Sequence, residues 1–73
     1  MDDIPWYSEA VLTVDSHLHR AGTLIQCVRK WVQLPEVQRS AAQLKLSFEL
    51  EGRRNLDGEQ IVRLTTLPSF LTA

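Results

Sequence analysis

The stretch YSEAVLTVDSHLHRAGTLIQCVRKWV, residues 7–32, carries the strongest pattern in the sequence. Its apolar side chains recur at alternating steps of four and three residues, which is the period of one face of an α-helix. The residues on that face are Tyr7, Val11, Val14, Leu18, Ala21, Ile25, Val28 and Val32, with Trp31 on its flank. The spacing therefore predicts a long amphipathic helix over residues 8–33.

Two starting points for this helix stay open. Ser8 is a suitable N-cap, and Pro35 ends the helix because its ring clashes with the preceding turn and it has no N–H to donate. However, residues 10–14 are rich in β-branched side chains, and Asp15-Ser16 is also a suitable N-cap pair. The helix therefore begins at 8, or it begins at 16 after a short strand or extended arm over 10–14.

Residues 35–51 carry two conflicting periods. Pro35 is suited to the first position of a helix, and apolar residues follow it at helical spacing through Phe48. Residues 44–51, LKLSFELE, instead alternate strictly between apolar and polar side chains, as in a half-buried strand. The helix-forming run over 41–45 favours a second helix at 35–51. The alternative is a strand at 44–51, which needs a pairing edge from residues 10–14 or from another subunit.

The C-terminal part predicts a third helix. Asp57 as N-cap and Gln60 three residues later form a capping box, and Leu56 with Ile61 is placed as a hydrophobic staple. Pro68 ends regular helix, and residues 69–71 are expected to cover the core. We therefore expect one small domain over 1–73 with an all-α, three-helix fold, preceded by a flexible arm at 1–7. The alternative fold is α+β.

Composition narrows the classes of function. The chain has 73 residues, of which 44% are apolar and 23% charged, with a formal net charge of −1. A single cysteine, Cys27, allows no disulfide within the chain. No run of eighteen apolar residues is present, and the N-terminus is acidic where a signal peptide would be basic. We expect a cytoplasmic protein with no membrane association.

The string Asp15-Ser16-His17-Leu18-His19 resembles the first metal-binding motif of amidohydrolase-type barrels. That resemblance implies His17 and His19 as ligands of a divalent ion. On a helix the two side chains diverge by about 200° and cannot share a metal. The serines have no G-x-S-x-G context, and Cys27 has no histidine partner within reach on a continuous helix. We therefore expect no catalytic residue, no metal and no cofactor.

The segment Arg39-Ser40-Ala41-Ala42-Gln43-Leu44-Lys45-Leu46-Ser47 is similar to part of the helix-turn-helix motif of DNA-binding domains. Lys45 occupies the position of the motif's turn glycine. The resemblance implies a small DNA-binding regulator that uses residues 37–54. Its nucleic-acid contacts would come from the basic side chains Arg39, Lys45, Arg53 and Arg54.

The apolar stripe over 7–32 favours a different function. A helix that is longer than its neighbours leaves apolar length uncovered, and such helices dimerise or occupy a partner's groove. The prediction is a non-catalytic protein-interaction or regulatory module that self-associates through helix 8–33, as a homodimer or with a helical partner. Its interface would comprise the stripe residues Tyr7, Val11, Val14, Leu18, Ala21, Ile25, Val28, Trp31 and Val32.

Overall fold

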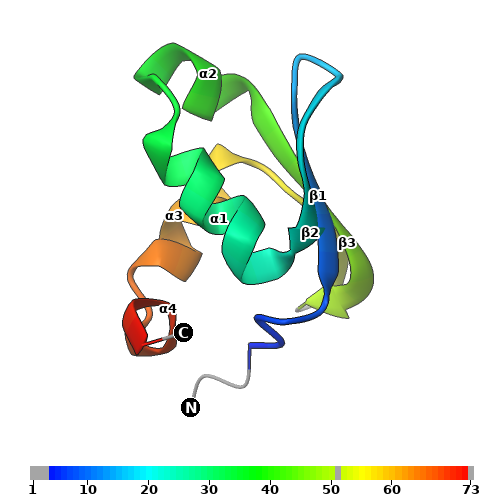
Figure 1. Ribbon diagram of the computed structural model, residues 1–73, viewed down its shortest axis with the longest axis vertical. Helices are drawn as coiled ribbons and strands as arrows, with labels where there is room; N and C mark the ends of the chain where they lie inside the picture. Colours follow the sequence, from blue (N-terminus) through cyan, green and yellow to red (C-terminus); the bar gives the residue numbers. More distant parts are fainter. Residues whose placement is uncertain (1–3, 51, 73) are drawn as a thin grey trace.

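A computed structural model describes residues 4–50 and 52–72 and shows an antiparallel sheet with helices packed on one face (Figure 1). The strands are β1 (Glu9–Val14), β2 (His17–Thr23), β3 (Ala42–Leu50) and β4 (Arg53–Leu56), in the spatial order β2-β1-β3-β4. The helices are α1 (Leu24–Gln33), α2 (Glu36–Ala41), α3 (Gly58–Thr65) and α4 (Pro68–Thr72). The fold is therefore α+β, and the predicted all-α fold and helical character are wrong.

The predicted helix over 8–33 is wrong in its first half, which is a β-hairpin. Asp15 and Ser16 have φ values of 50° and 67°, so they form the two-residue turn whose twist matches that of paired strands. Side chains of β1 at alternate positions, Ala10, Leu12 and Val14, are buried under the helices. Because β1 pairs with both β2 and β3, this segment is a strand, and its side chains alternate between the two faces of the sheet.

Helix α1 begins at Leu24, later than either predicted starting point. Thr23 is its N-cap, because the Thr23 hydroxyl accepts from the Gln26 N–H at 3.3 Å and the Gln26 side chain accepts from the Thr23 N–H at 3.1 Å. Gly22 makes room for this arrangement, since a Cβ there would lie 2.4 Å from Gln26 Oε1. At the other end Leu34 is extended before Pro35, as the proline predicts.

The predicted helix over 35–51 ends at Ala41, and the chain continues as β3. Leu44 and Leu46 are buried while Lys45 between them is exposed, in agreement with the alternating pattern. Leu44 pairs with Leu12 and Leu46 with Ala10, so the edge that β3 requires comes from β1 of the same chain. The α+β alternative, with residues 10–14 as that edge, is confirmed.

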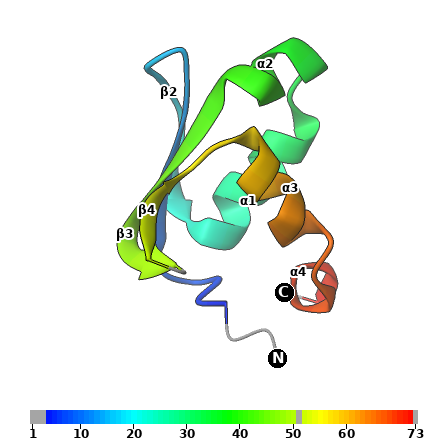
Figure 2. The ribbon, with the colours of Figure 1, turned by 180° about the vertical axis from the view of Figure 1, so that it is seen from behind.

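The capping box predicted for the third helix is confirmed. The Asp57 carboxylate accepts from the Gln60 N–H at 3.1 Å, and Gln60 Oε1 accepts from the Asp57 N–H at 3.1 Å. Leu56 and Ile61, the predicted staple, are both buried. Helix α3 packs against α1, β3 and β4 and so closes the second half of the core (Figure 2).

The two ends of the described chain contact each other, through Trp6 at the N-terminal end and Ser69 and Phe70 at the C-terminal end. Trp6 is 5% exposed, its indole Nε1–H donates to Ser69 Oγ at 3.0 Å, and its ring centre lies 5.7 Å from that of Phe70. Ser69 and Phe70 therefore help to cover the core, as expected, whereas Leu71 is 77% exposed and does not. Of the segment predicted to be a flexible arm, residues 1–3 lie outside the described residues, and Trp6 belongs to the core.

Candidate functional site

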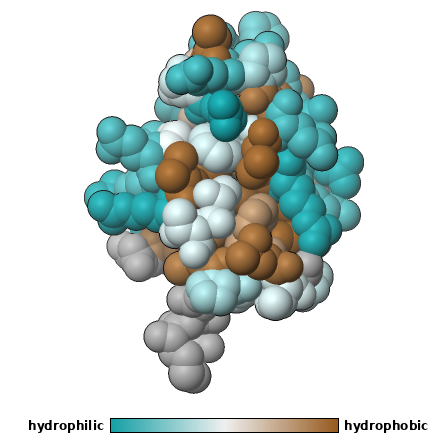
Figure 3. Space-filling model, turned by 90° about the vertical axis from the view of Figure 1, so that its left-hand side faces the viewer, coloured by the Kyte–Doolittle hydropathy of each residue, from teal (hydrophilic) through white to brown (hydrophobic). Residues whose placement is uncertain are grey.

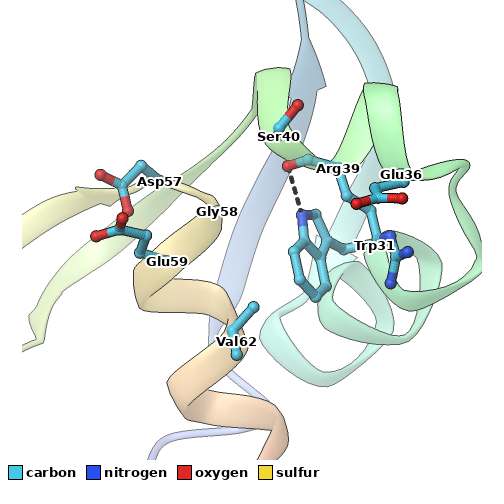
Figure 4. A pocket seen from close by; sticks show the side chains of 8 residues that line it. All are labelled: Trp31, Glu36, Arg39, Ser40, Asp57, Gly58, Glu59 and Val62. Atoms are coloured by element: carbon cyan, nitrogen blue, oxygen red, sulfur yellow. Dashed lines mark hydrogen bonds between the residues drawn. The ribbon is translucent and has the colours of Figure 1, made fainter.

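An open groove lies between α2 and the N-terminal end of α3, above the C-terminal half of α1 (Figure 4). Its volume is about 640 Å³, within the range of protein ligand sites. We call it the acidic groove, and its lining comprises Trp31, Glu36, Arg39, Ser40, Asp57, Gly58, Glu59 and Val62. These residues come from separate elements, so only the folded chain brings them together.

Trp31 forms the centre of the acidic groove and is fixed by its contacts with α2. The indole Nε1–H donates to the Arg39 carbonyl oxygen at 3.2 Å, and the Arg39 guanidinium carbon lies 5.8 Å from the ring centre. At that distance the guanidinium is attracted to the ring face. Figure 4 shows the ring between the Arg39 and Glu36 wall and the Val62 wall. Trp31 is only 5% exposed, so it belongs to the core and contributes a small part of its ring to the floor of the groove.

Gly58 sets the width of the acidic groove. A Cβ on Gly58 would lie 3.1 Å from the Arg39 carbonyl oxygen and 3.7 Å from Ser40 Cα. The start of α3 consequently approaches the backbone of α2 more closely than a larger residue allows. The Arg39 carbonyl, which accepts from the Trp31 indole, is the atom that such a Cβ would approach most closely.

The charge of the acidic groove is negative. Glu36, Asp57 and Glu59 supply three carboxylates against the single guanidinium of Arg39. Among the described residues none of these carboxylates forms an ion pair, since the one ion pair there joins Arg54 and Glu49 at 3.9 Å. The lining of the groove therefore carries a net negative charge, which favours a cationic group.

The helices also expose apolar side chains. Val32 of α1, Val37 of α2, Val62 of α3 and Leu71 of α4 are 44%, 80%, 47% and 77% exposed. Figure 3 shows apolar and weakly polar residues running over the helical side of the molecule, with hydrophilic residues on both flanks. A band of this composition, rimmed by polar residues, is typical of a protein-binding surface.

The predicted interface residues do not share one helix face. Four of them, Val14, Ile25, Val28 and Trp31, are buried in the core. The others are divided among different parts of the fold: Tyr7 precedes β1, Val11 lies in β1, Leu18 and Ala21 lie in β2, and Val32 lies in α1. Tyr7 and Leu18 are 74% and 66% exposed, so a contact with a partner at those positions stays a prediction.

The predicted nucleic-acid contacts are likewise dispersed. Arg39 lines the acidic groove, Lys45 is exposed on β3, and Arg53 and Arg54 lie in β4. The helix-turn-helix arrangement over 37–54 is wrong, because residues 42–50 and 53–56 are paired strands. Nucleic-acid binding by these side chains stays a prediction.

Sequence reasoning missed most of the groove. Glu36, Glu59 and Val62 were not identified as site residues, and Asp57 was identified only as a helix cap. No local signal marks them, because their common feature is proximity to Trp31 in the folded chain. The capping residues alone gave a usable signal, since they fix where α3 begins.

Outside the acidic groove the described chain contains one cysteine, Cys27. Cys27 is fully buried, its Sγ lies 3.4 Å from the Ala10 carbonyl oxygen, and burial raises its pKa. A thiol in such a site is a poor nucleophile. Within residues 4–50 and 52–72 no group of three His, Cys, Asp or Glu side chains is placed to hold a metal ion. No helix in that part of the chain is long and apolar enough to cross a membrane.

Comparison with protein families, with curated proteins and with solved structures gives no match to this chain. Its function must therefore be argued from the groove and the surfaces themselves.

Proposed function

We propose that this chain is a non-catalytic protein-interaction module of the cytoplasm, with a regulatory role, which binds a basic helical segment of a partner protein. The observation that carries the proposal is the acidic groove, whose lining combines Trp31 with the carboxylates of Glu36, Asp57 and Glu59, none of which forms an ion pair with a described residue. A lysine or arginine of the partner enters the groove, and apolar side chains of the same helix pack on the exposed apolar band of α1–α4. Neither contact requires a cofactor.

A different protein fits this surface better than a second copy of the chain does. In a two-fold symmetric dimer the same patch faces itself, so the carboxylates of two acidic grooves would approach one another. Like charges opposed in an interface disfavour association. A partner helix with basic and apolar residues avoids this repulsion and supplies the complementary charge.

The test uses a capped amphipathic helical peptide of leucine and lysine, and its charge-reversed counterpart of leucine and glutamate. We expect the lysine peptide to bind and to shift the NMR signal of the Trp31 indole N–H, and the glutamate peptide not to bind. Glu59→Lys should weaken the lysine peptide by at least about fivefold, because a partly exposed ion pair contributes about 1 kcal/mol.

Glu49→Lys is the matched control, since Glu49 is exposed on β3 and does not line the groove. Equal weakening by both substitutions would show only a general charge effect and would contradict the proposal. Sedimentation equilibrium of the chain alone provides the second measurement, with a monomer expected. A stable dimer that Leu18→Asp dissociates would instead favour self-association through the exposed sheet side.

A further inference from the structure

A second hollow is lined by residues of β3, β4, α3 and the turn after that helix. Its volume is about 480 Å³, and it is more enclosed than the acidic groove. Five apolar side chains line it: Ile4, Leu50, Leu56, Leu64 and Leu67. Leu56 and Leu64 belong to the core, and the other three are half-buried, so the core is hollowed at this point.

Two guanidinium groups stand at this hollow, from Arg53 of β4 and Arg63 of α3. Both residues are exposed, and neither forms an ion pair with a carboxylate in residues 4–50 or 52–72. Gln60 also lines the hollow and has an amide NH₂ group available, because only its Oε1 is used by the capping box. The cationic and donor groups therefore lie beside an apolar interior.

From this arrangement we infer that the hollow, named here the arginine pocket, binds a small amphiphilic carboxylate with a hydrocarbon chain. Arginine side chains recognise carboxylates through charge-assisted, often bidentate hydrogen bonds. The leucine-rich interior takes the hydrocarbon, whose transfer from water is favourable. Enclosure of the pocket favours a small molecule over a polypeptide that must enter and leave it. This ligand site is separate from the acidic groove and does not depend on the proposed function.

The experiment titrates the full chain with decanoate at pH 7, below the concentration at which decanoate forms micelles, by calorimetry and methyl NMR. We expect one-to-one binding with shifts at the Leu50, Leu56 and Leu67 methyl groups. Decanol, which lacks the charge, and butyrate, which lacks the chain, should each bind about tenfold more weakly or not measurably, because each omits one of the two contacts.

The double variant Arg53→Gln/Arg63→Gln should weaken decanoate about tenfold, since charge-assisted hydrogen bonds at exposed sites contribute less than buried ones. Arg54→Gln is the matched control: it is the neighbouring arginine, it pairs with Glu49, and it does not line the pocket. All of these side chains are exposed, so folding is preserved. Equal affinity of the double variant, or equal affinity for decanol, would overturn the inference. Tighter binding of a peptide with a free C-terminal leucine would also overturn it, in favour of a peptide carboxylate.

Discussion

The acidic groove and the arginine pocket lie on either side of one helix and have opposite charge. Gly58 and Val62 of α3 face the groove, whereas Gln60 and Leu64 face the pocket. The groove is open and is lined by three carboxylates, whereas the pocket is more enclosed and carries two guanidinium groups and no described carboxylate. A chain with a net charge of −1 thus separates its charges by surface, and we expect each hollow to favour ligands of the opposite sign.

Removing the support that the two hollows share should have the largest effect. Ile61 is fully buried between them and holds α3 against the rest of the core. Ile61→Ala should reduce the free energy of unfolding by roughly 2–5 kcal/mol through lost burial and a cavity. A chain of this size has a total stability of about 4–11 kcal/mol. Urea denaturation followed by circular dichroism measures the change.

Val62→Ala provides the comparison for this substitution, because its side chain is 47% exposed. We expect it to lower the free energy of unfolding by less than about 1 kcal/mol. Similar losses from the two variants would show that α3 is not anchored as the structure indicates. Both ligand affinities should fall together in Ile61→Ala and should change separately in the charge-reversal variants described next.

Charge reversal at one hollow should leave the other hollow unaffected. Arg53→Glu should weaken decanoate about tenfold, and Glu36→Lys should weaken the lysine peptide at least about fivefold. Each substitution should change the other ligand's affinity by less than about twofold, because charges separated by more than about 8 Å are screened at physiological salt. Parallel titrations of both variants with both ligands provide the measurement. A change of similar size in all four titrations would mean that the two hollows are not independent.

A smaller effect is expected at Asp57, which serves the groove and the helix end together. Asp57→Ala removes the N-cap of α3 and should cost about 1 kcal/mol of stability. It also removes one groove carboxylate, so the lysine peptide should bind more weakly while decanoate does not change. Asp57→Asn keeps a capping oxygen without the charge. We therefore expect Asp57→Asn to be as stable in urea as the parent chain but to bind the lysine peptide as weakly as Asp57→Ala does. If Asp57→Asn recovers both properties, Asp57 serves only as a helix cap and does not contribute charge to peptide binding.

Asp57 also illustrates what the sequence could predict. Its capping box with Gln60 and the end of α1 before Pro35 are confirmed, because each depends on side chains and backbone groups within four residues. Interactions of this range act in nearly the same way whatever surrounds them. Leu56 and Ile61, the predicted staple, are both buried, and a staple is likewise a short-range interaction.

The hairpin over 9–23 could not be identified from the spacing that predicted a helix. Of the stripe positions in β1, only Val14 is buried, whereas Ala10 and Leu12, which are buried in β1, do not belong to the stripe. Pairing of β1 with β3, some thirty residues away, selects the strand. Similarly, Leu44–Leu50 satisfied a helical and an alternating pattern, and the presence of β1 as an edge decides for the strand.

Both hollows escaped sequence analysis for a related reason. Trp31 and Arg39 were singled out, but as members of a helix face and of a DNA-binding segment. Their contact in the groove depends on the turn at Pro35, which brings α2 back over α1. Residues of the pocket are drawn from positions 4 to 67. Tertiary contacts of this kind determine where charged side chains gather in a small fold, and a local sequence pattern does not reveal them.

The smallest expected effect concerns Cys27, which lines neither hollow. A substitution there should change the stability of the chain without changing its affinity for either ligand. Burial raises the pKa of this thiol, and the nearby Arg20 charge and a backbone hydrogen bond only partly oppose that effect. The folded chain therefore retains the thiol proton at a pH where the unfolded chain, with a thiol pKa near about 8.5, has lost it. Stability should be unaffected by this group below that pH and should fall as the pH rises toward the raised value.

The measurement compares urea midpoints at pH 7.5 and about pH 9.5 in the parent chain and in Cys27→Ala. We expect the midpoint to fall further in the parent, because only the parent has a thiol to ionise on unfolding. The change in urea midpoint is taken between two pH values within each protein. The destabilisation caused by the cavity that alanine leaves is the same at both pH values and therefore cancels. An equal decline in both proteins would show that ionisation elsewhere causes it. At pH 7.5 the ratio of the decanoate and peptide affinities should be the same in both proteins, because neither ligand reaches the hairpin side of α1 where this thiol is buried.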